Sequence, residues 1–399
     1  MSFAALALIC LVALLGPLLS LSKVARMPVV IGELAVGVIL GVTWLDLLKP
    51  TDPTFSFLAQ VGFALVMFLA GSHVPMRDPA IRTSLGRGAA RAVACGVLAV
   101  PVGFGIAALS HTGHGALYAV LLASSSASVV MPIIGDRPVN TPAGMDMLPQ
   151  LAIADSVCIV LLPLVLEPQR ALAAALGALA VLAVAGLFFV ILRWAEASGR
   201  RRAIHKLSEK RRLAIELRIT LAMLFTVAAV ATAAQISVML AGFAMGLAVS
   251  AVGEPRRVAH QTFALTEGLF GPLFFVWLGA SLNLRELLSY PWSIVLGLLL
   301  GFGALLVHGA LALTGQPLVV GLATAAELGV PVGAATVGTQ LGVLEPGEST
   351  ALLLGALITT GAVALLSGRL QTAVSTPARP ADDAAVAAHP SPPAATPTP

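Results

Sequence analysis

One carboxylate stands near the middle of a long apolar run. The run covers residues 148–166, and its acidic residue is Asp155. A charge at the centre of a bilayer costs about 2.5–3.5 kcal/mol on insertion scales, so such a residue usually binds a proton or an ion. The alternative is that Asp155 is protonated or paired and only joins helices.

Two other apolar segments, 115–134 and 317–341, are interrupted near their middle. Paired interrupted helices in the two halves of a chain are typical of transporter sites built on inverted repeats. Hydroxyls and carbonyls at such breaks can coordinate a dehydrated cation. The alternative is small-residue packing at two tight helix interfaces. The residues concerned are Ser124, Ser125, Ser126, Ser128 and Pro132 in the first segment, and Glu327, Gly329 and Pro331 in the second.

Two further ionisable residues lie within apolar segments. His308 is the only ionisable group in segment 292–313 and titrates near neutral pH. It could compensate the charge of an ionised Asp155, or it could serve only as a satisfied hydrogen-bonding group. Glu33, near the start of segment 28–47, and Glu327 are possible supporting residues for the ion site.

The composition requires a membrane to position these residues. Of 399 residues, 58% are hydrophobic and 11% are charged, far below the roughly 25% charged residues of soluble domains. We count about thirteen spans in an all-α polytopic chain. Cys10, Cys95 and Cys158 lie inside apolar runs and form no disulfide or zinc pattern. The expected spans are 2–21, 28–47, 55–72, 88–110, 115–134, 147–166, 171–193, 213–234, 236–252, 266–284, 292–313, 317–341 and 349–367.

The basic residues predict the orientation. Lys and Arg accumulate in alternate loops, which places the C-terminus in the cytoplasm and the N-terminus outside an inner or plasma membrane. The basic loop 195–212 is then a cytoplasmic linker, and the Ala/Pro-rich tail 372–399 is expected to be disordered. The basic residues lack the interleaved aromatics of a nucleic-acid-binding face. No nucleic-acid partner and no cofactor are expected.

Several motifs, taken in order, resemble the monovalent cation:proton antiporter superfamily, in the branch of sodium/proton exchangers and Kef-type proteins. Residues 28–41 read PVVIGELAVGVILG, similar to the family's PxxxGExxxGxxxG helix. Residues 62–71, GFALVMFLAG, are like its third helix, and 271–284, GPLFFVWLGASLNL, are similar to its PLFFxxxGxxL helix. SSSASVVMPII and LAIADSVCIVLL look like its broken crossing helix and its ion-binding helix.

The resemblance implies an antiporter fold of inverted repeats over residues 1–371. It implies core helices at about 88–193 and 292–367, scaffold or dimerisation helices at about 1–54 and 213–284, and a homodimer in lipid. Asp155 would bind the transported cation and the proton in turn, with Ser125, Ser126 and Ser128 beside it. The family usually has a polar residue where this chain has Ala154, and Lys or Arg where it has His308.

These observations predict a secondary transporter that exchanges Na⁺ or K⁺ for protons, with electroneutral exchange the simpler stoichiometry. An uncoupled, channel-like cation pathway is the alternative, because Ala154 and His308 depart from the family pattern. An intramembrane hydrolase using a segment 115–134 serine, His308 and Asp155 is a distant third, since there is no G-x-S-x-G nucleophile elbow. We therefore expect a transporter and not an enzyme.

Overall fold

The computed structural model is helical throughout the residues that it describes, with no strands among them. These residues are 1–20, 29–72, 79–134, 139–201, 213–234, 236–253, 256–282 and 289–375, together with 204, 208, 211 and 285. Within them, nine helices are long and apolar enough to cross a membrane, and 3–18 and 238–252 are shorter apolar helices. The prediction of an all-α membrane fold is confirmed, whereas the count of thirteen stays a prediction.

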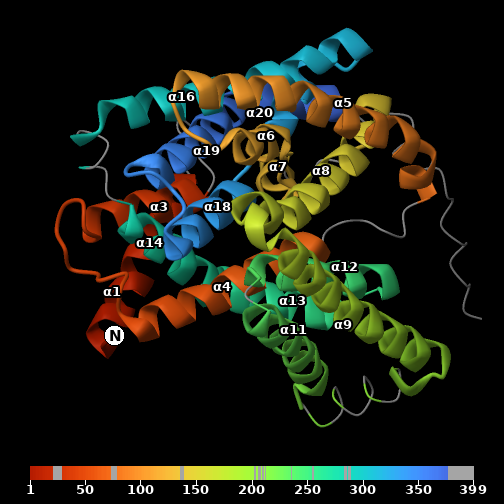
Figure 1. The fold of residues 1–399 in the computed structure, drawn as a ribbon. Helices are drawn as coiled ribbons and strands as arrows, with labels where there is room; N and C mark the ends of the chain where they lie inside the picture. The colour runs from red at the N-terminus through yellow and green to blue at the C-terminus, as the bar shows by residue number, and fades with distance from the viewer. Residues whose placement is uncertain are drawn as a thin grey trace, which may run out of the picture.

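Each of the expected spans contains helix in the structure (Figure 1). The first half of the chain holds α1 (Phe3–Ala13), α2 (Leu15–Ser20), α3 (Val29–Leu40), α4 (Pro53–Ser72), α5 (Pro79–Leu109), α6 (Gly115–Ala123), α7 (Ala127–Ile134), α8 (Pro142–Leu166) and α9 (Ala171–Ala197). The second half holds α11 (Ile215–Ala233), α12 (Val238–Val252), α13 (Arg256–Leu265), η2 (Thr266–Phe270), α14 (Gly271–Ser281), α16 (Pro291–Gly309), α17 (Leu318–Thr324), α18 (Gly329–Leu341), α19 (Glu348–Leu365) and α20 (Ser367–Val374).

The helices pack in two groups (Figure 1). In one group, α4 packs on α12 and α14, and α14 also packs on α3. In the other, α5 packs on α6 and α8, and α16 packs on α19. Helix α8 contacts members of both groups, since it also meets α9, α12 and α18. The helix that carries Asp155 therefore lies where the two groups meet.

Glycines explain how closely the first group packs. A Cβ atom at Gly37 would lie 2.3 Å from the carbonyl oxygen of Val276, and one at Gly41 would lie 2.3 Å from Cα of Ala280. Both distances are impossible for real atoms, so the PVVIGELAVGVILG motif lets α3 and α14 touch backbone to backbone. Small residues serve this purpose in membranes because lipid supplies no hydrophobic force between helices.

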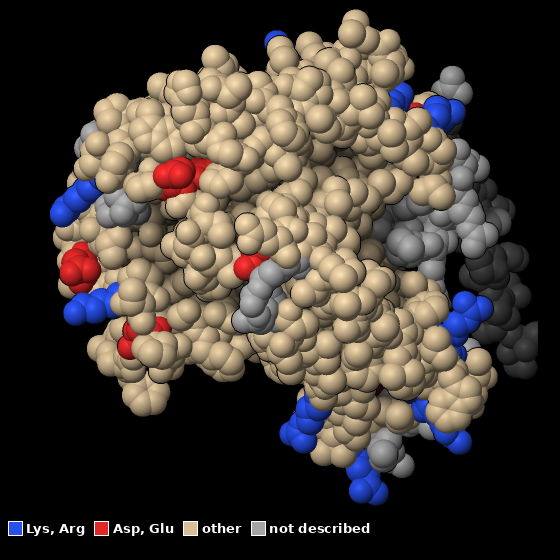
Figure 2. All heavy atoms as spheres, viewed as in Figure 1, with Lys and Arg blue, Asp and Glu red and all other residues tan. Residues whose placement is uncertain are grey.

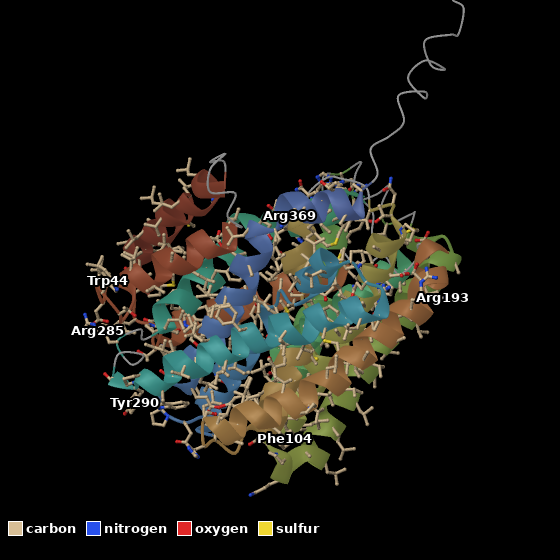
Figure 3. The ribbon with its side chains drawn as sticks, turned by 90° about the horizontal axis from the view of Figure 1, so that it is seen from above. Trp44, Phe104, Arg193, Arg285, Tyr290 and Arg369 are labelled. Atoms are coloured by element: carbon tan, nitrogen blue, oxygen red, sulfur yellow. The ribbon has the colours of Figure 1, made fainter. Side chains whose placement is uncertain are left out.

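The surface matches a chain surrounded by lipid. Most of the face in Figure 2 is tan, and its Lys and Arg side chains lie at the margins. Seen from above, Trp44, Arg285 and Tyr290 lie on one side of the molecule and Arg193 lies on the other (Figure 3). Tyr and Trp favour the boundary between lipid and water, so their side marks one edge of the apolar belt.

The C-terminal boundary of the helical region lies further along than expected. Helix α20 ends at Val374, and the side chains of Leu370 and Val374 are fully buried. Residues 372–374 are therefore packed helix, although the sequence placed them in the tail. The rest of that predicted tail, from 376 to 399, and most of the basic linker's charged positions lie outside the described residues.

Candidate functional site

The first interruption is a three-residue break at Ser124–Ser126, between α6 and α7. All three serines are buried. Ser125 Oγ donates to the carbonyl oxygen of Thr324 at 2.7 Å, and the Ser126 N–H donates to the carbonyl oxygen of Ala326 at 2.8 Å. Both acceptors belong to the second interrupted segment. The two breaks therefore meet and satisfy one another's backbone groups, as a crossing inside lipid requires.

The second interruption covers residues 325–328, between α17 and α18. It contains Glu327 itself, whereas Gly329 and Pro331 stand in the first turn of α18. Proline is tolerated there because the first turn of a helix has no internal acceptor for its N–H groups. The sequence identified the interrupted segment, and the structure places the break a few residues before the Gly and Pro.

Asp155 lies in the middle of α8 and is 5% exposed. Its carboxylate is close enough to that of Glu327 for the two to repel one another. Ala154, which precedes it, is buried and brings no polar group. The predicted ion-binding carboxylate thus lies beside the second break, and the second carboxylate at this site comes from the other half of the chain.

His308 binds to both interrupted segments. Its Nδ1 lies 2.9 Å from Thr324 Oγ1, and its Nε2 lies 3.2 Å from the carbonyl oxygen of Leu122 and 3.3 Å from Cys95 Sγ. Because the Leu122 carbonyl can only accept, Nε2–H donates to it, and a neutral His308 then accepts at Nδ1 from the Thr324 hydroxyl, which also lies 2.7 Å from the Gly321 carbonyl oxygen. Apart from Cys95 of α5, these partners of His308 belong to the ends of α6 and α17, so His308 links the two helix ends.

Two glutamines extend this network, and the sequence reading missed them. Gln316 Nε2 donates to Gln150 Oε1 at 2.8 Å, and Gln150 Nε2 donates to Thr324 Oγ1 at 3.3 Å. Both glutamines are buried. A signal was available, since Gln150 and Thr324 stand five and three residues before the two carboxylates. Amides and hydroxyls inside apolar runs are as informative as charges when they occur at helical spacing.

One predicted residue, Glu33, does not join this cluster in the described structure. Glu33 is buried in α3, where its Cγ lies beside Gly16, and its described electrostatic partner is Glu267 of η2. These contacts belong to the first helix group and not to the crossing. Ser128 lies in α7, but its side chain is outside the part that the structure describes.

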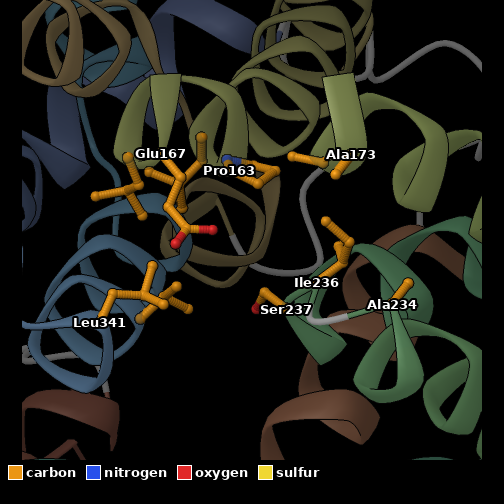
Figure 4. A pocket seen from close by; sticks show the side chains of 11 residues that line it. Pro163, Glu167, Ala173, Ala234, Ile236, Ser237 and Leu341 are labelled. Atoms are coloured by element: carbon orange, nitrogen blue, oxygen red, sulfur yellow. The ribbon is translucent and has the colours of Figure 1, made fainter. Parts of the chain in front are cut away.

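Two adjoining cavities open between the helix groups, beyond the end of α8. One of about 160 Å³ is lined by Pro163, Glu167, Ala234 and Ser237, among others, and Figure 4 shows the Glu167 carboxylate pointing into it. A second, of about 250 Å³, reaches Gln60 and Phe63 of α4 and Gly333 of α18. The cavities share Ile236, Ser237, Val337 and Leu341. Together they form a vestibule whose inner lining includes Leu162, about 10 Å along α8 from Asp155.

Another buried acid lies at the N-terminal end of α19. Glu348 is 0% exposed, and its Oε1 lies 2.7 Å from His114 Nδ1 and 2.6 Å from the Tyr118 hydroxyl, which donates to it. Its Oε2 accepts from the Glu345 N–H at 2.8 Å. The hydrogen bond to Glu348 is the main reason that the pKa of His114, in the loop before α6, is raised.

Asp146, near the start of α8, is also a buried acid. Arg87 Nε lies 2.9 Å from Asp146 Oδ2, and Arg91 Nη1 lies 3.0 Å from the same oxygen. The basic residues come from α5, so this ion pair joins α5 to α8 on the side of the molecule opposite to Glu348 along those helices. Of the two acids in α8, Asp146 is therefore paired with arginines, whereas Asp155 has no arginine partner among the described residues.

Comparison with known proteins identifies the family. The model of the family described as "Sodium/hydrogen exchanger, transmembrane" matches residues 10–368. This chain belongs to the sodium/hydrogen exchanger family. The resemblance found from the motifs is thereby confirmed. The match includes both interrupted segments and Asp155, so the whole crossing lies inside the family region.

Curated relatives carry the names of antiporters and efflux systems. The chain is 24% identical over 379 residues to the putative Na⁺/H⁺ antiporter YjbQ of Bacillus subtilis, covering 90% of this chain and 61% of the relative. It is 28% identical to the glutathione-regulated potassium-efflux system protein KefC of Klebsiella pneumoniae, covering 69% of this chain and 44% of that protein. The chain therefore spans about half the length of these relatives.

A solved structure shares the fold. The sodium proton antiporter MjNhaP1 of Methanocaldococcus jannaschii matches with a TM-score of 0.67 at 17% identity, over 93% of this chain and 98% of that one. At this identity the likeness concerns the fold alone. It confirms the antiporter architecture expected from the motifs.

Proposed function

We propose that this chain exchanges a monovalent cation, Na⁺ or K⁺, for protons across a membrane by alternating access. One observation carries the proposal. A buried carboxylate, Asp155, lies on α8, which packs against α6, α7, α17 and α18, and the ends of these broken helices meet at hydrogen-bonding distance. The names of the related antiporters agree with this activity.

Competition at Asp155 supplies the mechanism. The acid releases its proton toward one side and accepts a cation in its place, because an empty ionised carboxylate is costly in a low-dielectric site. Ser125 Oγ donates to Thr324, yet its oxygen keeps lone pairs that can face a cation. Carrying either a proton or a cation neutralises the site, and this requirement couples the two fluxes.

Movement of the second helix group against the first would alternate the access of Asp155. We assign α5–α8 and α16–α19 to the moving core, and α1–α4 and α11–α14 to the scaffold of a homodimer. The vestibule lies between these groups, on the side that the loop charges assign to the outside of the plasma membrane. Its lining is mainly apolar, but it includes Ser237 and Gln60, whose polar groups can face a hydrated ion.

His308 has a supporting role in this scheme. It stands where the family usually has a fixed positive charge, and it contacts the ends of both α6 and α17. We propose that it holds the two breaks together while the cation and proton exchange at Asp155, and that its protonated form compensates the empty carboxylate.

The test uses the purified full chain in proteoliposomes that contain a pH-sensitive dye. We expect proton efflux when Na⁺ or K⁺ is added, and no efflux above background for Asp155→Asn. Ser156→Ala, one residue along the same helix, is the matched control and should keep the flux. Retained cation-dependent flux in Asp155→Asn would contradict the proposal. Cation flux that follows voltage and ignores the pH gradient would favour the uncoupled alternative.

A further inference from the structure

The second carboxylate of the crossing has one oxygen without a partner. Glu327 is 5% exposed, and its Oε2 is fully buried with no hydrogen bond among the described residues. Buried polar atoms in native structures are almost always satisfied, so an exception calls for an explanation. An unsatisfied ionised carboxylate would be the most costly group of this kind.

Among the described residues, none of those that line the space beside Glu327 donates a hydrogen bond to this oxygen. A cavity of about 10 Å³ beside it is lined by Pro331 and by apolar residues of α6, α16 and α19. A water molecule needs about this volume but also two to four polar partners, which these walls lack. The lining residues besides Glu327 and Pro331 are Leu121, Leu122, Leu300, Leu352, Gly355 and Ala356.

In the part of the chain that the structure describes, the titratable groups that interact with Glu327 carry no fixed positive charge. Asp155 of α8 repels it, and the thiols of Cys95 (α5) and Cys158 (α8) also interact with it electrostatically. His308 of α16 is committed to Thr324 and Leu122. On α19, Thr360 Oγ1 donates to the backbone carbonyl of Glu327 and not to its carboxylate. Two neighbouring carboxylates in such a setting cannot both stay ionised on their own. Either one of them is protonated, or a cation compensates their charge.

We propose that Glu327 is the second proton-binding residue of the transport site and keeps its proton while Asp155 carries the cation. The inference rests on the exchange function proposed above. Glu327 thereby supplies, from the second interrupted segment, the polar neighbour that Ala154 does not supply beside Asp155.

The charges of the cycle then balance. In one state both acids are protonated and the site is neutral. In the other, Asp155 has released one proton to the bulk and holds one cation, while Glu327 remains a neutral acid. One cation moves for one proton, so the exchange is electroneutral. When the pH is high enough to remove the Glu327 proton as well, the loaded site gains a negative charge and the carrier slows.

Replacing the acid by its neutral isostere tests this assignment. Glu327→Gln replaces the acid O–H of the transport site by an amide N–H that cannot ionise, so we expect the exchange rate near neutral pH to fall by about threefold, less than 1 kcal/mol in barrier. We also expect its activity to persist toward alkaline pH by about one unit beyond the wild-type decline. Thr360→Val is the matched control, because it alters the same break without touching the carboxylate, and its pH profile should follow wild type.

Three results would overturn the inference while leaving the exchange function intact. The pH profile of Glu327→Gln could superimpose on that of wild type. Folded Glu327→Gln could lose exchange, which would show that an ionised residue is needed at this position. The wild-type rate could change when the membrane potential is clamped at different values, which would exclude electroneutral exchange. This last measurement needs no variant, so it stands even if the substituted protein does not fold. Absence of any exchange in wild type would instead remove the proposed function.

Discussion

Two buried glutamates in the second half of the chain have opposite surroundings. Glu348 is fully buried at the start of α19 and has His114, Tyr118 and the Glu345 N–H as partners. Glu327 is buried at the crossing, and one of its oxygens has no described partner. Both side chains are buried, so the difference between the two glutamates lies in their hydrogen-bonding partners. A carboxylate that is surrounded by donors is stable as an anion and builds structure, whereas one without donors must take up a proton or a cation.

Removing Glu348, the acid with hydrogen-bonding partners, should have the largest effect on stability. Glu348→Ala leaves His114, the Tyr118 hydroxyl and a backbone N–H without their acceptor, and breaking a buried pair costs about 3–5 kcal/mol. We expect a large fall in the melting temperature of the detergent-purified protein, measured by intrinsic fluorescence. A melting temperature within error of wild type would show that this cluster does not stabilise the fold.

The second-largest expected effect is the difference in stability between the neutral isosteres Glu348→Gln and Glu327→Gln. Glu348→Gln should destabilise by about 1–3 kcal/mol, because an amide replaces an acceptor of several hydrogen bonds. Glu327→Gln should change stability by less than about 1 kcal/mol, since it removes an acid with a poorly satisfied oxygen. Thermal unfolding of both variants in one buffer at neutral pH checks the difference. Equal losses in the two variants would remove the distinction on which the comparison depends.

The titration of His114 should make the stability of the protein depend on pH. Its pKa is raised above the ordinary value of 6.5, so it binds its proton more tightly in the folded state. The stabilisation is complete below that ordinary value and is lost as the pH rises through the folded-state pKa. We expect the melting temperature of wild type to fall across this window and that of His114→Asn to fall less. Parallel curves for the two proteins would assign the dependence to another group.

The smallest effect should come from the arginines on Asp146. Arg87 is 64% exposed at its side chain, whereas Arg91 is 12% exposed. An exposed ion pair contributes about 0–1 kcal/mol, so Arg87→Gln should be nearly silent and Arg91→Gln should cost more. Denaturation of the two variants measures the order, with Glu196→Gln as the control, since the Glu196 carboxylate lies 3.5 Å from Arg201 Nη1 in a separate ion pair. A larger loss of stability for Arg87→Gln than for Arg91→Gln would contradict the prediction that the more buried arginine contributes more.

Much of the fold was predictable because its signals are local. Apolar runs of spanning length, glycine spacing in 28–41 and the isolated charge at Asp155 each reflect one segment and its lipid surroundings. The serines at 124–126 and the acid at 327 also indicated the two interruptions, because polar residues inside an apolar run are a local signal. Helix ends were less certain, and α20 shows this, since its last turn is held by the burial of Val374 against distant parts of the chain.

The partners of the site residues were not predictable, because they come from segments far apart in sequence. From the sequence, His308 could compensate the charge of Asp155 or serve as a hydrogen-bonding group, and only the structure gave its contacts, which are the carbonyl of Leu122, Thr324 and Cys95. Glu33 and Glu327 read alike as acids in apolar helices, yet one interacts with Glu267 and the other with Asp155. A hydrogen bond or a repulsion depends on separations of a few ångströms, which only the packing of whole helices sets.

By itself, the sequence determined that this chain is a polytopic helical membrane protein with a central acid and two interrupted segments. It did so because apolar length, charge and helix-breaking residues act within one span. Only the tertiary structure decided which acids have partners. It brought the two breaks together, gave Glu348 its donors and left Glu327 beside Asp155, because the surroundings of a buried charge are supplied by other helices.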